Sequence, residues 1–158
     1  MNLPDDMYSQ SILELAAAIP RTARLAMPGA TATAHSKLCG STVTVDLVME
    51  GEVVIDYGQS VKACLLGQSA ASVMGREVIG STATELRAVG AAMRRMLKED
   101  GPPPQGKWGD LAMLEPVRDY KARQPSTLLV FDAVEDAISQ IEAERAAEAK
   151  ARRSEEHV

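Results

Sequence analysis

The chain has 158 residues, of which 46% are hydrophobic, 3% aromatic and 25% charged, and its formal net charge is -5. This length and composition are typical of one globular domain with a core that needs no disulfide framework, and the acidic balance argues against a nucleic-acid partner. No apolar run is long enough to cross a bilayer, and the start MNLPDDMYSQ lacks the basic residues of a secretion signal. We therefore expect a cytoplasmic protein with reduced thiols and no membrane partner.

The first sixty residues predict one helix and then three strands. Residues 8–19 carry apolar side chains at helical spacing, and Pro20 ends the pattern because proline cannot continue the hydrogen-bond ladder. The segments ATATAHS, STVTVDLVM and EVVIDYGQS then alternate with a period of two, with Glu50-Gly51 as a tight turn. We expect an antiparallel meander whose middle strand turns Val43, Val45 and Leu47 towards the core.

Two helices are predicted after the strands. The first covers residues 64–79, with Gly80 as its C-cap, and the second begins at a capping box, Thr82 to Glu85. The apolar stripe of the second helix consists of Leu86, Val89, Met93, Met96 and Leu97.

The last third of the chain predicts a loop, a short segment and a final helix. GPPPQGK, residues 101–107, is rich in proline and glycine and predicts a long loop before a short amphipathic piece at 110–114. The final helix is expected from Ser126, a preferred N-cap residue, and residues 142–158 are expected to be a charged helical tail that frays into solvent. The predicted fold class is therefore α+β, a single domain over 1–158 in which about four to five helices cover one face of a three-stranded antiparallel sheet.

The two cysteines are the residues with the most distinctive chemistry. Cys39 precedes a predicted strand and Cys64 begins a predicted helix. A helix N-terminus and the nearby Lys62 both favour a thiolate, so we expect Cys64 to be the more acidic thiol. The alternative is that both cysteines are small buried hydrophobic residues, and their spacing alone does not decide between these interpretations.

Four segments, in order, resemble the U-type iron-sulfur scaffold family, in particular its SufU-like branch, which is related to the N-terminal domain of NifU. These segments are LCGSTVTVDL, ACLLGQSAASVM, GDLAMLEPV and ARQPSTLLVFDAV. The resemblance implies a non-enzymatic scaffold or sulfur acceptor for iron-sulfur cluster assembly, with a cysteine desulfurase as partner. It also implies that Cys39 and Cys64 are metal ligands and candidate sulfur acceptors.

The same resemblance implies a degenerate metal site. Ser41 and Ser126 stand where the family has an aspartate and a cysteine, and a protonated hydroxyl is a weak ligand for zinc. His35 is a candidate substitute ligand, although an extended chain would hold it roughly 13 Å from Cys39, and a solvent-facing or hydrogen-bonded role fits it better. Asp46 and Asp119 are further acids that the sequence does not select between.

Two functions remain open at this stage. A scaffold or sulfur acceptor would carry an iron-sulfur cluster or zinc weakly, or not at all, on one chain, whereas a homodimer could offer four cysteines to one bridging cluster. The alternative is a non-catalytic binding or regulatory module that keeps the scaffold fold without metal or sulfur chemistry. Because both functions share a fold, the fold cannot separate them.

Overall fold

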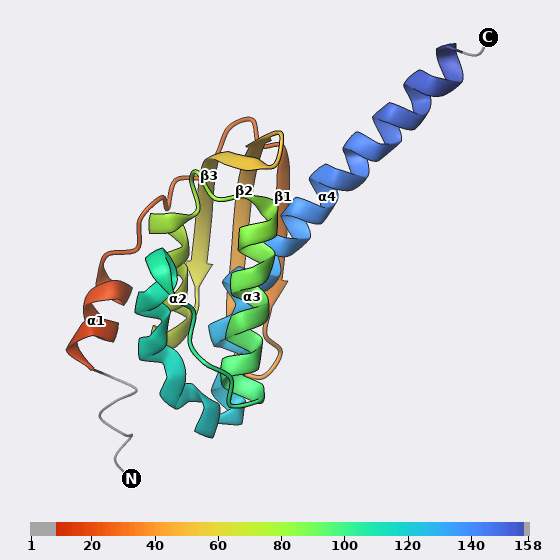
Figure 1. Cartoon of the computed structure of the whole chain (residues 1–158). Helices are drawn as coiled ribbons and strands as arrows, with labels where there is room; N and C mark the ends of the chain where they lie inside the picture. Colours follow the sequence, from red (N-terminus) through yellow and green to blue (C-terminus); the bar gives the residue numbers. More distant parts are fainter. Residues whose placement is uncertain (1–8, 157–158) are drawn as a thin grey trace.

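A computed structural model describes residues 9–156 of the chain (Figure 1). Its elements are α1 (Gln10–Ala17), β1 (Ala30–His35), β2 (Thr42–Glu50), β3 (Val53–Lys62), α2 (Leu65–Glu77), α3 (Ala83–Lys98), the 3-10 helices η2 (Gly106–Asp119) and η3 (Lys121–Arg123), and α4 (Gln124–Glu156). Among the described residues, no helix is both long enough and apolar enough to span a membrane.

The three strands form one antiparallel sheet in the order β1-β2-β3, as predicted. Gly51 lies between β2 and β3 with φ +59°, in the left-handed region that glycine adopts without a steric penalty. Val43, Val45 and Leu47 are fully buried on the covered face. The alternation read from the sequence therefore identified the correct face of the central strand.

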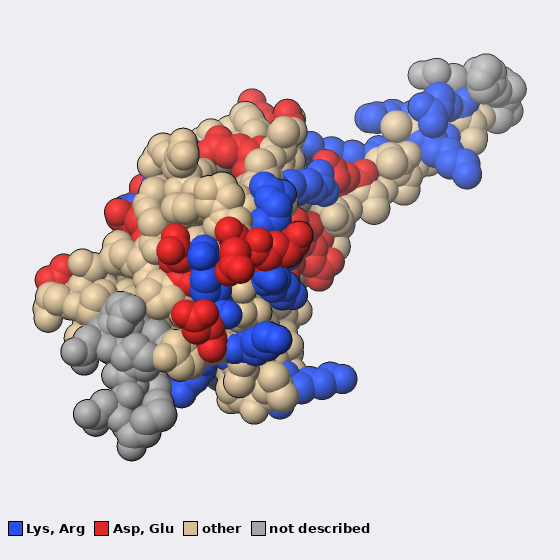
Figure 2. Space-filling view, turned by 60° about the horizontal axis from the view of Figure 1, so that its bottom comes forward, with Lys and Arg blue, Asp and Glu red and all other residues tan. Residues whose placement is uncertain are grey.

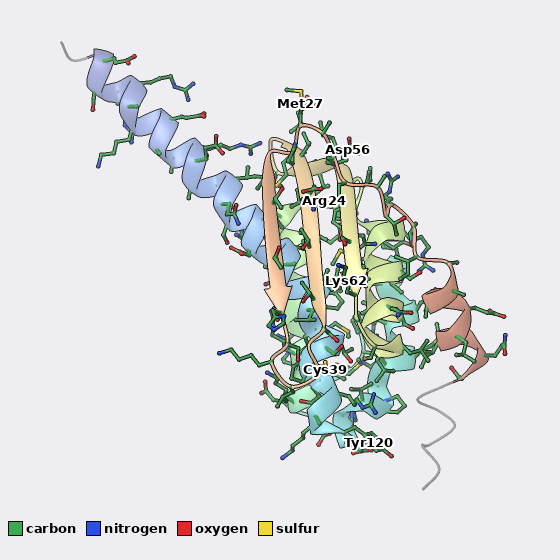
Figure 3. All side chains as sticks on the ribbon, turned by 180° about the vertical axis from the view of Figure 1, so that it is seen from behind. Arg24, Met27, Cys39, Asp56, Lys62 and Tyr120 are labelled. Atoms are coloured by element: carbon green, nitrogen blue, oxygen red, sulfur yellow. The ribbon has the colours of Figure 1, made fainter. Side chains whose placement is uncertain are left out.

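Helices cover one face of the sheet, and residues 9–156 place no helix on the opposite face (Figures 1 and 3). α4 packs on β1 and β2, and α2 packs on β3, while α3 lies on α4 and η2 lies on α2 and α3. The buried apolar residues of these layers form one core cluster. The predicted α+β architecture is confirmed.

The predicted start of α3 is confirmed, whereas the predicted C-cap of α2 is wrong. Thr82 caps α3, because its side chain accepts a hydrogen bond from the Glu85 N–H at 3.0 Å. Gly80 is not the C-cap of α2; this position belongs to Val78. Gly80 lies two residues further on with φ +88°, and its N–H donates to the carbonyl of Val54. The glycine therefore serves the turn between α2 and α3 and ties this turn to β3.

The segment predicted as a loop and a short helical piece is mostly a 3-10 helix. Trp108, Leu111, Leu114 and Val117 are its buried side chains, each three residues after the last. A 3-10 helix has three residues per turn, so this spacing aligns all four on one face. The Glu85 carboxylate accepts a hydrogen bond from the Trp108 indole N–H at 2.8 Å and fixes the start of η2 against α3. The prediction of a short piece at 110–114 was therefore too narrow.

α4 begins at Gln124, two residues earlier than predicted, so Ser126 lies inside its first turn and is not its N-cap. Arg145 still contacts the sheet, because its guanidinium donates to the Met49 carbonyl at 2.9 Å, and the end of the helix then projects from the domain to Glu156 (Figure 1). Residues 142–156 are helical, and residues 157–158 of the predicted tail lie outside the described residues. Fraying of the tail in solution stays a prediction. Figure 2 shows acidic and basic side chains mixed over the face turned forward, with basic ones gathered towards the far end of α4.

A buried aspartate ties the segment before β1 to the uncovered face of the sheet. Asp46 on β2 has no exposed side-chain surface, and its carboxylate accepts hydrogen bonds from Arg24, from the Leu25 N–H and from the Thr31 hydroxyl. Gly58 on β3 permits the close approach, because a Cβ there would lie 2.3 Å from the Ala23 carbonyl oxygen. Although burial opposes the charge, the hydrogen bonds and the Arg24 guanidinium hold the pKa of Asp46 below its usual 3.8.

Replacing Asp46 should destabilise the fold in a pH-dependent way. A lowered folded-state pKa stabilises the fold fully above pH 3.8, and this contribution is lost as the pH falls through the folded-state value. Asp46→Asn should lower the melting temperature at pH 7 by roughly 5 °C, and the gap to the parent should shrink in acid. The exposed Asp56 provides the control, since Asp56→Asn should change the melting temperature by no more than roughly 2 °C. A gap that stays constant down to pH 3 would contradict this role.

Candidate sulfur site

A tight connection between β1 and β2 presents Cys39 at one end of the sheet (Figure 3). Ser36 and Ser41 close this connection: the Ser36 N–H donates to the Ser41 carbonyl at 2.8 Å, and the Gly40 N–H donates to the Ser36 carbonyl at 2.9 Å. Gly40 has φ +71°, a conformation that strongly favours glycine. The Cys39 side chain is therefore exposed, and its neighbour Leu38 is 73% exposed.

Cys64 and Ser126 approach the same place from two helices. Cys64 is the N-cap residue of α2 and is half-buried, whereas Ser126 in the first turn of α4 is buried. Gly67 on α2 makes their contact possible, because a Cβ at this position would lie 2.9 Å from the Ser126 carbonyl oxygen and 3.1 Å from its Oγ. A larger residue at position 67 would separate the two helices.

The four residues form one hydrogen-bonded chain, which we call the thiol–serine cluster: Cys39, Ser41, Ser126 and Cys64. Cys64 Sγ lies 3.1 Å from Ser126 Oγ, the Ser126 hydroxyl donates to Ser41 Oγ at 3.2 Å, and Ser41 Oγ lies 3.0 Å from Cys39 Sγ. The structure thus brings together the residues that the sequence predicted to meet, although they come from separate parts of the chain.

The hydrogen bonds of the cluster favour a thiolate at Cys39. Because Ser126 donates to Ser41, the Ser41 hydroxyl is free to donate to the Cys39 sulfur. The Ser41 hydroxyl, the Ser36 hydroxyl and the Ser41 backbone N–H stabilise the anion and lower the pKa of Cys39 from 9.0 to about 7. The sequence had predicted the more acidic thiol at Cys64. Cys64 does begin a helix as expected, but the donors that stabilise a thiolate converge on Cys39.

The other candidate ligands lie outside the thiol–serine cluster. His35 is exposed, and its Nδ1 is 2.9 Å from the Thr42 hydroxyl, with which it forms a hydrogen bond. Asp46 is engaged with Arg24 on the uncovered face, and Asp119 is exposed at the end of η2. Within residues 9–156, no three His, Cys, Asp or Glu side chains are grouped to hold a metal ion.

Sequence reasoning missed two residues that shape the site. Ser36 sits three residues before Cys39, and its Oγ is 3.6 Å from the cysteine sulfur. Gly67 lies within the predicted helix over residues 64–79, but the sequence did not predict its contact with α4. A serine at the end of an alternating segment was the available signal for Ser36, whereas the role of Gly67 depends on which residue of α4 faces it.

The α+β fold of this chain also occurs in known proteins. No model of a protein family matches the chain. The crystal structure of the N-terminal part of a nitrogen-fixing NifU-like protein from Brucella abortus is 60% identical, with a TM-score of 0.87, over 88% of this chain and 96% of that one. The iron-sulfur cluster assembly scaffold protein IscU of Thermotoga maritima is 26% identical over 137 residues, 85% of this chain and 94% of its own.

A third protein shares the fold at lower identity. The structure named as a scaffold for the SUF system of Fervidobacterium islandicum has a TM-score of 0.77 at 19% identity, over 86% of this chain and 99% of that one. The sequence identity to the Brucella protein and the share of both chains that is matched define the class of this protein. The chain belongs to the U-type, NifU-like family of iron-sulfur scaffold proteins.

The acidity of Cys39 can be measured on a chain that retains only this thiol. In Cys64→Ser, the alkylation rate should rise with pH with a midpoint near 7. Removal of the main donor in Cys64→Ser/Ser41→Ala should move this midpoint upwards by roughly one unit. The control is Cys64→Ser/Ser60→Ala, which removes a hydroxyl on β3 outside the cluster. It should have the same pH midpoint as Cys64→Ser. A midpoint near 9 before Ser41 is changed would contradict the hydrogen-bond account.

Proposed function

We propose that this protein is a scaffold-type component of iron-sulfur cluster assembly that receives sulfur on Cys39 and, as a single chain, holds metal weakly. The thiol–serine cluster carries this proposal: an exposed thiol at the tip of a tight turn, joined through two buried hydroxyls to a second thiol. The relatives with functional names are scaffolds, so we assign no enzymatic activity to the chain.

Sulfur uptake requires a thiolate that a donor can reach. A thiolate attacks the outer sulfur of a persulfide donor, so the acceptor must be both ionised and exposed. Cys39 meets both conditions, because its pKa is lowered to about 7 and its side chain is exposed on the turn. We infer that the donor is a cysteine desulfurase, and Leu38 beside Cys39 offers an apolar contact for such a protein.

The donor atoms of the site do not fit a complete metal centre in one chain. Closed zinc sites take four ligands, and iron-sulfur clusters are held mainly by four thiolates. The cluster supplies two thiols and two hydroxyls, and a hydroxyl stays protonated at neutral pH. We therefore derive no step through a bound metal and treat any iron-sulfur cluster as cargo.

A second copy of the chain would complete a set of four thiolates. Two chains meeting at their exposed Cys39 turns would bring two cysteine pairs together around one shared cluster. This arrangement uses only residues already in the thiol–serine cluster. A homodimer of this kind is part of the proposal.

The proposed acceptor can be tested with a cysteine desulfurase and free cysteine. The fully reduced Cys64→Ser chain should gain the mass of one sulfur atom, and peptide mapping should locate it on Cys39. Cys39→Ser should lose this uptake. The exposed, unrelated Ser154→Ala serves as a control and should behave like the parent. If the parent and Cys64→Ser both gain no sulfur on Cys39, the chain is better described as a binding or regulatory module that keeps only the scaffold fold.

A further inference from the structure

The thiol–serine cluster contains more than an acceptor needs. Uptake of one sulfane sulfur uses a single exposed thiol, and Cys39 provides it. Cys64 is half-buried behind the turn, and its sulfur is 3.1 Å from the Ser126 hydroxyl. A second thiol in this position is less exposed than Cys39, and the buried hydroxyls of Ser126 and Ser41 join it to the first thiol. Its placement suits reaction with sulfur already bound to Cys39.

We propose that Cys64 is a resolving thiol that reduces the sulfane sulfur carried by Cys39 and releases it as sulfide, an inference that rests on the proposed uptake at Cys39. The Cys64 sulfur attacks the Cys39 sulfur that is bonded to Cβ. A Cys39–Cys64 disulfide forms, the bond to the outer sulfur breaks, and hydrosulfide leaves. The two thiol sulfurs are oxidised by two electrons in total, and the sulfane sulfur accepts both. No external oxidant is required.

The two serines give the reaction a route for its proton. The cluster runs from the Cys64 thiol to Ser126, from Ser126 to Ser41, and from Ser41 to the sulfur at Cys39. If each hydroxyl passes on one proton and receives another, the proton of Cys64 reaches the departing hydrosulfide and the serines end unchanged. The products are one disulfide and one hydrogen sulfide per persulfide.

In this reaction, serine is a better residue at positions 41 and 126 than an aspartate or a cysteine would be. A carboxylate at 41 would place a negative charge beside the departing hydrosulfide, and a third thiol at 126 would compete for the disulfide. Hydroxyls avoid both effects while remaining buried and hydrogen-bonded. After each turnover, an external dithiol reductant would restore the two thiols.

Inorganic tetrasulfide provides a probe that needs no partner protein. The reduced, metal-free chain is treated briefly without oxygen, freed of tetrasulfide by desalting, and then followed by intact mass and by sulfide release. The parent should first gain the mass of one sulfur atom and then lose it together with the mass of two hydrogens. One sulfide per chain should be released, and peptide mapping should find a Cys39–Cys64 disulfide that dithiothreitol reverses.

Variants of the chain separate sulfur uptake on Cys39 from the later release of sulfide. Cys64→Ser should take up sulfur on Cys39 and keep it, with loss of sulfide release. Once loaded with sulfur on Cys39, Ser126→Ala should release sulfide several-fold more slowly than the parent. Thr127→Val should match the parent, because the Thr127 hydroxyl lies outside the cluster and donates to the Arg123 carbonyl at 2.9 Å. A parent that keeps its persulfide as long as Cys64→Ser does would overturn the resolving role alone. Failure of both chains to take up sulfur would overturn the acceptor proposal and this inference together.

Discussion

The contact between α2 and the first turn of α4 is the constraint on which the site depends. Gly67 has no side chain, and this absence lets Ser126 lie directly against α2, within hydrogen-bond distance of Cys64. The same serine reaches Ser41 at the start of β2 and so joins the two helices to the β1–β2 turn. Three distant parts of the chain are thereby held in one place by close packing and hydrogen bonds.

The two thiols and two hydroxyls of the site determine which reactions we propose for it. Two thiols are sufficient to accept and exchange sulfur, but they are half the donors that a closed metal centre requires. The buried hydroxyls are satisfied by hydrogen bonds to one another and to the sulfurs, so the site is stable as it stands. Cys39 is exposed to other molecules, whereas Cys64 is half-buried. The two thiols therefore differ in how easily a protein donor can reach them, although hydrogen bonds of the cluster join them.

The sheet and the apolar faces of the helices could be predicted because they depend on local periodicity. The 3-10 helix could not, since the spacing of Trp108, Leu111, Leu114 and Val117 follows a period that is rare over such a length. The start of α4 was misplaced because Ser126 is a good N-cap residue in isolation, while its hydroxyl is used in the site. The lowered pKa of Cys39 depends on donors that only the folded chain brings together, so the rule for helix N-termini could not identify this cysteine.

Zinc binding measures most directly whether one chain lacks the ligands for a metal centre. The protein as purified should hold far less than one zinc per chain, and added zinc should barely change its melting temperature. Ser41→Asp/Ser126→Cys should restore four donors in one place, bind one zinc and gain a large thermal stabilisation, because a ligand that binds only the folded state stabilises it. Either single change should give an intermediate result. One tightly held zinc per chain in the unmodified protein would contradict the account, because an additional ligand would then complete the site.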